Sequence, residues 1–125
     1  MRTCALLLLI LAFLVACGPA AVTQTNKTER YTIQFSVDKP TIGTRTFTIG
    51  VSDSNGAPLS VDQVIVTPVM SEMGMASPEM IATPSGPGRY TAQGDAFSML
   101  GAWQITVRVV AGGKEDKTTF TVQIQ

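Results

Sequence analysis

Apolar and polar residues alternate in short runs from Tyr31 to the end of the chain. The clearest runs cover residues 31–37, 47–51, 103–109 and 119–124, with an apolar residue at every second position. Successive side chains of a strand point to opposite faces, so a period of two predicts strands with one face on a core. Weaker runs near residues 61–69, 80–82 and 89–93 predict three further strands.

Turn-forming residues separate these runs, at positions 40–43, 55–56, 84–88 and 112–113. No stretch between them shows a helical period. This arrangement predicts an all-β domain, an immunoglobulin-like antiparallel β-sandwich of about seven strands. Trp103 is the single tryptophan of the chain and is expected at the centre of the core.

The N-terminus reads as a secretory signal, because Arg2 precedes an uninterrupted apolar run from Ala5 to Val15. The run ends in Leu14-Val15-Ala16-Cys17, which resembles the bacterial lipobox. We therefore expect cleavage before Cys17, lipidation of its thiol, and anchorage in the cell membrane or the outer membrane, facing the extracytoplasmic side. The alternative is an ordinary signal peptide with an incidental cysteine.

Residues 18–29 contain mainly Gly, Ala, Thr, Gln and Asn and almost nothing to bury. Such a composition predicts a disordered tether, with a reach of roughly 20 Å. The expected organisation is a lipoprotein signal peptide at residues 1–16, the lipidated Cys17 with its flexible tether at residues 17–29, and one β-sandwich domain at residues 30–125.

Composition argues against two classes of function. Nine basic and nine acidic side chains leave no net charge, so no nucleic-acid partner is expected. The chain has no histidine, and its cysteines are Cys4, in the signal, and the lipidated Cys17. The commonest general base and the commonest activated nucleophile would be missing from the mature chain, so we do not expect an enzyme.

The segment from Met70 to Met80 contains four methionines together with Gly74 and Pro78. Met70, Met73 and Met75 follow neither a strand period nor a sustained helical period, so they are not expected to fill one core face. Thioether sulfur is a soft ligand that suits Cu(I) and binds without losing a proton. One hypothesis is a Cu(I) site made by these three residues and Met99, and the other is an apolar loop that docks a partner.

The strand count predicts where this loop lies. Each tight connection in an antiparallel sandwich reverses the chain, so the loop at Met70–Met75 and the turn around Met99 should share one end. With the first strand at Tyr31, this end would point away from the lipid anchor, towards a soluble copper-donor or copper-acceptor protein.

Several short motifs occur in a fixed order along the predicted domain. They are Asp38-Lys39-Pro40 with Gly43, Asp53 with Gly56 and Pro58, Val64 with Val66, Met70-x-x-Met73-Gly74-Met75, Gly88-Arg89-Tyr90 and Phe97-x-Met99-x-Gly101-x-Trp103-x-Ile105-x-Val107. Together they resemble the YtkA-like domain, which is related to FixH-like proteins. The resemblance implies a small secreted or lipid-anchored bacterial β-sandwich, often associated with copper handling or respiratory oxidases. Many relatives place a histidine among the methionines of this loop, and its absence here leaves an all-thioether site for Cu(I).

Overall fold

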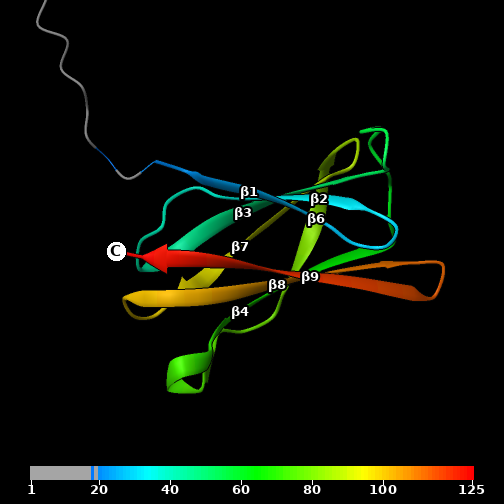
Figure 1. The fold of residues 1–125 in the computed structure, drawn as a ribbon. Helices are drawn as coiled ribbons and strands as arrows, with labels where there is room; N and C mark the ends of the chain where they lie inside the picture. The colour runs from blue at the N-terminus through cyan, green and yellow to red at the C-terminus, as the bar shows by residue number, and fades with distance from the viewer. Residues whose placement is uncertain (1–17, 19) are drawn as a thin grey trace, which may run out of the picture.

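The computed structural model describes residue 18 and residues 20–125, which form an antiparallel β-sandwich (Figure 1). Cys17 and the predicted signal peptide lie outside the described residues. In chain order the elements are β1 (Val22–Lys27), β2 (Thr32–Val37), β3 (Gly43–Ser52), β4 (Gln63–Met70), the 3₁₀ helix η1 (Ser71–Met73), β5 (Met75–Ala76), β6 (Met80–Gly86), β7 (Arg89–Phe97), β8 (Gly101–Ala111) and β9 (Lys114–Ile124). The predicted all-β sandwich is confirmed.

The strands form two layers that share β6. Their order is β1-β2-β3-β7-β6-β4-β8-β9, and β5 pairs with β4. Figure 1 shows β1, β2 and β3 on one side, which we call the first layer, and β4, β8 and β9 on the other, the second layer. The first half of β6 pairs with β4, and from Thr83 onward the same strand pairs with β7. A single strand therefore closes one side of the sandwich.

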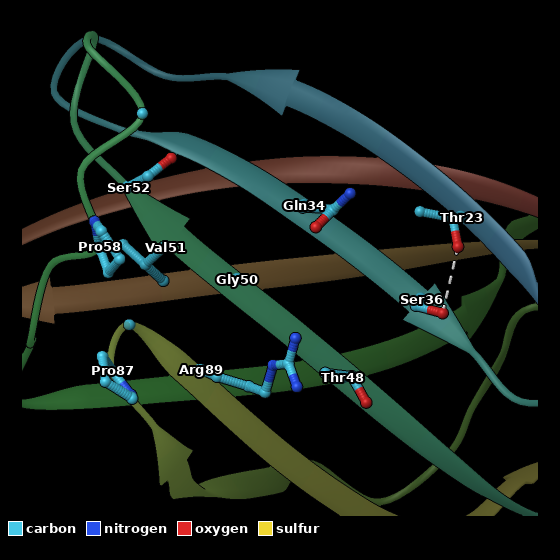
Figure 2. A pocket seen from close by; sticks show the side chains of 12 residues that line it. Thr23, Gln34, Ser36, Thr48, Gly50, Val51, Ser52, Pro58, Pro87 and Arg89 are labelled. Atoms are coloured by element: carbon cyan, nitrogen blue, oxygen red, sulfur yellow. Dashed lines mark hydrogen bonds between the residues drawn. The ribbon is translucent and has the colours of Figure 1, made fainter.

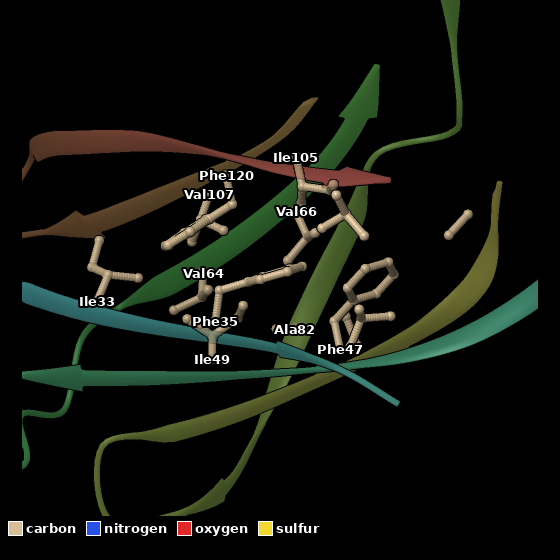
Figure 3. Close-up of a cluster of buried hydrophobic side chains, with 14 of the residues drawn as sticks. Ile33, Phe35, Phe47, Ile49, Val64, Val66, Ala82, Ile105, Val107 and Phe120 are labelled. Carbon is tan, nitrogen blue, oxygen red and sulfur yellow. The ribbon is translucent and has the colours of Figure 1, made fainter. Parts of the chain in front are cut away.

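The core lies between the two layers, and the alternation of each strand explains it. Apolar residues from both sheets are fully buried, among them Phe35, Phe47, Val66 and Ile105 (Figure 3). The rings of Phe35 on β2 and Phe120 on β9 stack across the layers, with centroids 4.9 Å apart. Trp103 is completely buried, as predicted, and packs edge-on against Phe97.

The first strand was not predicted, and the expected tether is wrong for most of its length. Residues 22–27 pair with β2 from Val22 opposite Val37 to Lys27 opposite Thr32. Gln24 and Asn26 then reach β9: the Gln24 amide donates to the Thr121 carbonyl at 2.8 Å, and the Asn26 amide donates to the Thr119 carbonyl at 3.0 Å. These side chains close the second side of the sandwich, so the domain begins at residue 22 rather than at residue 30.

Two other strands differ from the prediction. The strand predicted near residues 80–82 was expected to end at Pro84. This prediction is wrong, because β6 continues to Gly86. Pro84 pairs with Tyr90 of β7, and no other described strand pairs with this half of β6. A strand edge without a second partner tolerates the missing N–H of proline. The two-residue strand β5 was also not predicted, because it is too short to show a period.

The added strand β1 changes where the chain enters the domain. Val22 lies opposite Val37, beside the turn at residues 38–42, and the Gln125 N–H donates to the Pro40 carbonyl at 3.0 Å. Both described termini therefore lie at one end of the sandwich, on the left in Figure 1. We call it the methionine end and define it by the turns at residues 38–42, 71–74 and 98–100. The loop at residues 70–75 was predicted to lie at the end opposite the lipid anchor. In the structure it lies at the end where the chain enters the domain at Val22.

Candidate functional site

Met70 and Met75 are direct neighbours on the inner face of the second layer. Met70 is the last residue of β4 and Met75 the first of β5, and the two are paired across the antiparallel ladder. Residues paired in this way project from the same face, with Cβ atoms about 4.5–5.5 Å apart. Met70 is buried in the core and Met75 is half-buried against it.

Met99 reaches the same end of the core from the turn between β7 and β8. Its carbonyl accepts a hydrogen bond of 3.0 Å from Trp103 Nε1, so the turn is tied to the central tryptophan. Two residues later, a Cβ on Gly101 would lie 3.0 Å from Met70 Cε. The Met99 side chain is half-buried and packs against the core. The strand count therefore placed the methionine loop and Met99 correctly relative to each other.

Met73 does not join these three residues. It lies in η1, and its side chain is 60% exposed. The Ser71 hydroxyl donates to Gln104 Oε1 at 2.8 Å and fixes η1 against β8, while Gly74 adopts a left-handed φ of 60° that turns the chain into β5. The predicted set thus divides into an inner group, Met70, Met75 and Met99, and one outer residue, Met73.

The chemistry of the inner group is that of soft, uncharged sulfur. No group of three or more His, Cys, Asp or Glu side chains that could hold a metal ion occurs in the described part of the chain. Hard cations prefer clustered oxygens, whereas Cu(I) prefers thioether or thiolate sulfur. The residues that meet at the methionine end therefore fit Cu(I) better than Zn²⁺, Ca²⁺ or Mg²⁺.

A separate groove of about 490 Å³ lies on the outer face of the first layer (Figure 2). Polar side chains line much of it, including Gln34, Ser36 and Thr48. Thr23 of β1 donates to Ser36 at 3.3 Å along one border. Arg89 is the one charged residue of this lining, so the groove offers hydrogen bonds but no paired acid and base.

Ile42 and Leu100 were not among the predicted site residues, and they lie in two turns of the methionine end. Ile42 is 45% exposed and Leu100 is 60% exposed. The signal was present in the sequence, because an apolar residue stands in each of two segments otherwise suited to turns, Pro40–Gly43 and Ser98–Gly101. Isolated exposed apolar residues are common, however, and only the fold brings these two together.

No described helix has the length and apolar character needed to cross a membrane.

Comparison with known proteins identifies the family. No curated protein and no solved structure matches the chain. The family model described as YtkA-like matches residues 25–108, from within β1 to within β8, and this range contains all four predicted site methionines. Since the match covers more than half of the chain, the protein belongs to the YtkA-like family.

Proposed function

We propose that this protein is an extracytoplasmic lipoprotein, anchored through Cys17, whose domain binds Cu(I) at the methionine end. The observation that carries the proposal is that Met70 and Met75, paired across β4 and β5, lie at the same end of the core as Met99 in the turn between β7 and β8. We propose a binding function for this site and no catalysis. Bound Cu(I) would be held for storage or for transfer to or from a partner protein.

The inner group supplies three sulfur ligands without a protonation step. Thioethers carry no proton near neutral pH, so binding requires no deprotonation and should persist in an acidic compartment. Met70 and Met75 are held by the β4–β5 pairing, and Met99 by its turn. Half-burial of Met75 and Met99 leaves part of each side chain at the surface, where a metal could reach it.

The test is a Cu(I) titration of the protein against a competing chromogenic chelator, under reducing conditions. Leucine has similar volume to methionine but no sulfur, so Met75→Leu combined with Met99→Leu should lower the affinity at least tenfold and leave the fold intact. Met80→Leu is the matched control, because Met80 also packs against the core but its Sδ lies beside Gly94 rather than in the inner group. Met73→Leu shows whether the outer residue takes part.

Equal Cu(I) affinity in the wild type and in the Met75→Leu/Met99→Leu variant would return these residues to a packing role. The same titration at pH 5.5 and pH 7.5 should give nearly equal affinities. A strong loss at acidic pH would indicate ligands other than thioethers.

A second candidate is a docking module with no metal, and the exposure of Met73 favours it. Absence of competitive Cu(I) binding in the wild-type protein would leave this alternative.

A further inference from the structure

Exposed apolar side chains are concentrated at the methionine end. Within the described residues, four large apolar side chains are strongly exposed: Ile42, Met73, Ile81 and Leu100. Three of them, Ile42, Met73 and Leu100, each occupy a different turn of the methionine end. Ile81 lies instead on β6, opposite Ile65, a position five residues before Met70 on β4 and therefore about 17 Å away along the strand.

The register of the strands places the three turns at the same end of the sandwich. Gly43 pairs with Phe97, so the turn holding Ile42 lies next to the turn holding Leu100. Val69 of β4 pairs with Gln104 of β8, so η1 follows at the same end of the neighbouring strand. The three apolar residues thus lie at one end of the sandwich, and we call Ile42, Met73 and Leu100 together the tip.

Hydrogen bonds hold two of these turns in place. Arg45 donates from Nε to the Thr41 carbonyl at 2.8 Å and from its guanidinium to the Ile42 carbonyl at 2.7 Å. Ser71 is bound to Gln104 on β8. The apolar side chains are therefore presented to solvent by fixed backbone.

The chain reaches the domain at this same end. Only residues 18–21 separate Cys17 from the start of β1 at Val22. An extended chain spans about 3.3–3.6 Å per residue, so the five steps from Cys17 to Val22 cover roughly 18 Å at most. A lipid on Cys17 would hold Val22, which lies at the methionine end, within that distance of the membrane surface.

Charge does not set the character of the tip. The exposed charged residues in its turns are Asp38, Lys39 and Glu72, which are of both signs and leave a single net negative charge. A contact made by this end should therefore depend on apolar burial and respond little to salt or to anionic lipid.

We propose that the methionine end rests on the bilayer that carries the Cys17 lipid, with Ile42, Met73 and Leu100 in the headgroup layer. This inference rests on the lipid anchor of the proposed function. Its consequence is that the inner methionine group opens towards the membrane. A copper donor or acceptor would then be a protein of that membrane rather than a soluble protein.

The test uses the full lipidated protein in phosphatidylcholine vesicles. A single cysteine is introduced as Leu100→Cys or, at the opposite end of the sandwich, as Asn55→Cys, and is labelled with a polarity-sensitive fluorophore. The acylated Cys17 would not react. We expect blue-shifted emission and several-fold stronger quenching by nitroxide lipids for the label at position 100 than for the label at position 55, with no change on adding salt.

Controls separate the apolar contact from simple proximity. Ile42→Ser with Met73→Ser, in the protein labelled at position 100, should lower the quenching, whereas Ile81→Ser should leave it unchanged. Ile81 is the matched control because it is 61% exposed but lies outside the tip.

Three results would overturn the proposal. Equal quenching at positions 55 and 100 would show a domain that does not rest on its methionine end. A label at position 100 that is already shielded without vesicles, in protein produced from residue 18 onward and so without Cys4 and Cys17, would show that a second copy covers the tip. Protein that never enters the vesicle fraction would contradict the anchor itself, and with it the localisation in the proposed function.

Discussion

Asp116 is the one buried charged residue in the described part of the chain, at 9% exposure. It lies on β9 and binds the loop between β1 and β2: its carboxylate accepts hydrogen bonds from the Thr28 hydroxyl at 2.7 Å and from Arg30 Nε at 2.7 Å. Burial on its own raises the pKa of Asp116, but the hydrogen bonds from Arg30 and Thr28 outweigh it and hold the pKa below its ordinary value. The ion pair therefore joins the two layers at the end opposite the methionines.

The lowered pKa of Asp116 predicts a pH-dependent contribution to stability. A carboxyl group whose pKa is lower in the folded state stabilises the fold above its unfolded pKa, which is ordinarily 3.8, and loses that contribution as the pH falls through the folded value. Asp116→Asn should lower the free energy of unfolding by about 2 kcal/mol at pH 7. Urea unfolding at pH 7 and at pH 3 measures it, and the difference between wild type and variant should shrink at pH 3. A difference independent of pH would contradict the role of the charge.

Trp103 supports a second prediction at the scale of one residue. It is fully buried, packs against Phe97 and donates to the Met99 carbonyl. Trp103→Ala should cost about 3–5 kcal/mol, because it leaves a large cavity in the core. Chemical denaturation of the two proteins compares their stabilities directly. A variant whose melting temperature stays within a degree or two of the wild type would contradict the central position of this side chain.

The sequence predicted Trp103 better than it predicted the methionines. A lone aromatic residue in a clear alternating strand has one plausible place, the core. Met70, Met73 and Met75 fit no period, and their side chains were therefore assigned to one loop. The structure separates them, because Met70 still belongs to the inner face of β4 whereas Met73 lies beyond its end. The point at which β4 ends decides this, and strand ends leave little trace in a sequence.

Among the elements, β1 explains why the pattern of apolar residues was insufficient. Its half-buried positions are Val22, Gln24 and Asn26, so its inner face is mostly polar. The amides are needed there because they donate to backbone carbonyls at the edge of β9 and do not face the apolar core. Threonines at positions 23, 25 and 28 favour extended backbone and were the available signal. The seven other long strands were predicted because each has an apolar face.

The closure of the sandwich by these amides can be tested on β1 alone. Gln24→Ala with Asn26→Ala removes side-chain bonds worth about 1 kcal/mol each. Backbone amides of β1 should then exchange with solvent deuterium roughly thirtyfold faster, while β8 exchanges as before. Thr25→Ala is the matched control, since Thr25 is exposed on the same strand. Unchanged exchange in the double variant would show that pairing with β2 is sufficient to hold β1.

For the whole molecule, the unpredicted strand β1 reverses the predicted position of the methionine end relative to the point where the chain enters the domain. Two strands, β6 and β7, separate the methionine loop from Met99, and both were predicted, so their shared end followed from the sequence. The position of that end relative to the predicted anchor depended on every strand that follows Cys17, including β1. Counting strands therefore predicts well whether two neighbouring loops share an end of the sandwich. It predicts poorly whether a loop and a distant terminus do, because one missed strand reverses the answer.

The adjacency of the first and last strands has one more consequence. Val22 and Gln125 lie at the same end, and the side chains of β1 already touch β9. A short glycine-serine linker could join them, and the chain could be opened instead at the exposed hairpin Gly112-Gly113. This circular permutation would keep every strand and its partners, yet the new N-terminus would emerge at the opposite end. A lipid added there would present the opposite end of the same domain to a membrane, so the end of this fold that a lipid would hold depends on where the chain is opened.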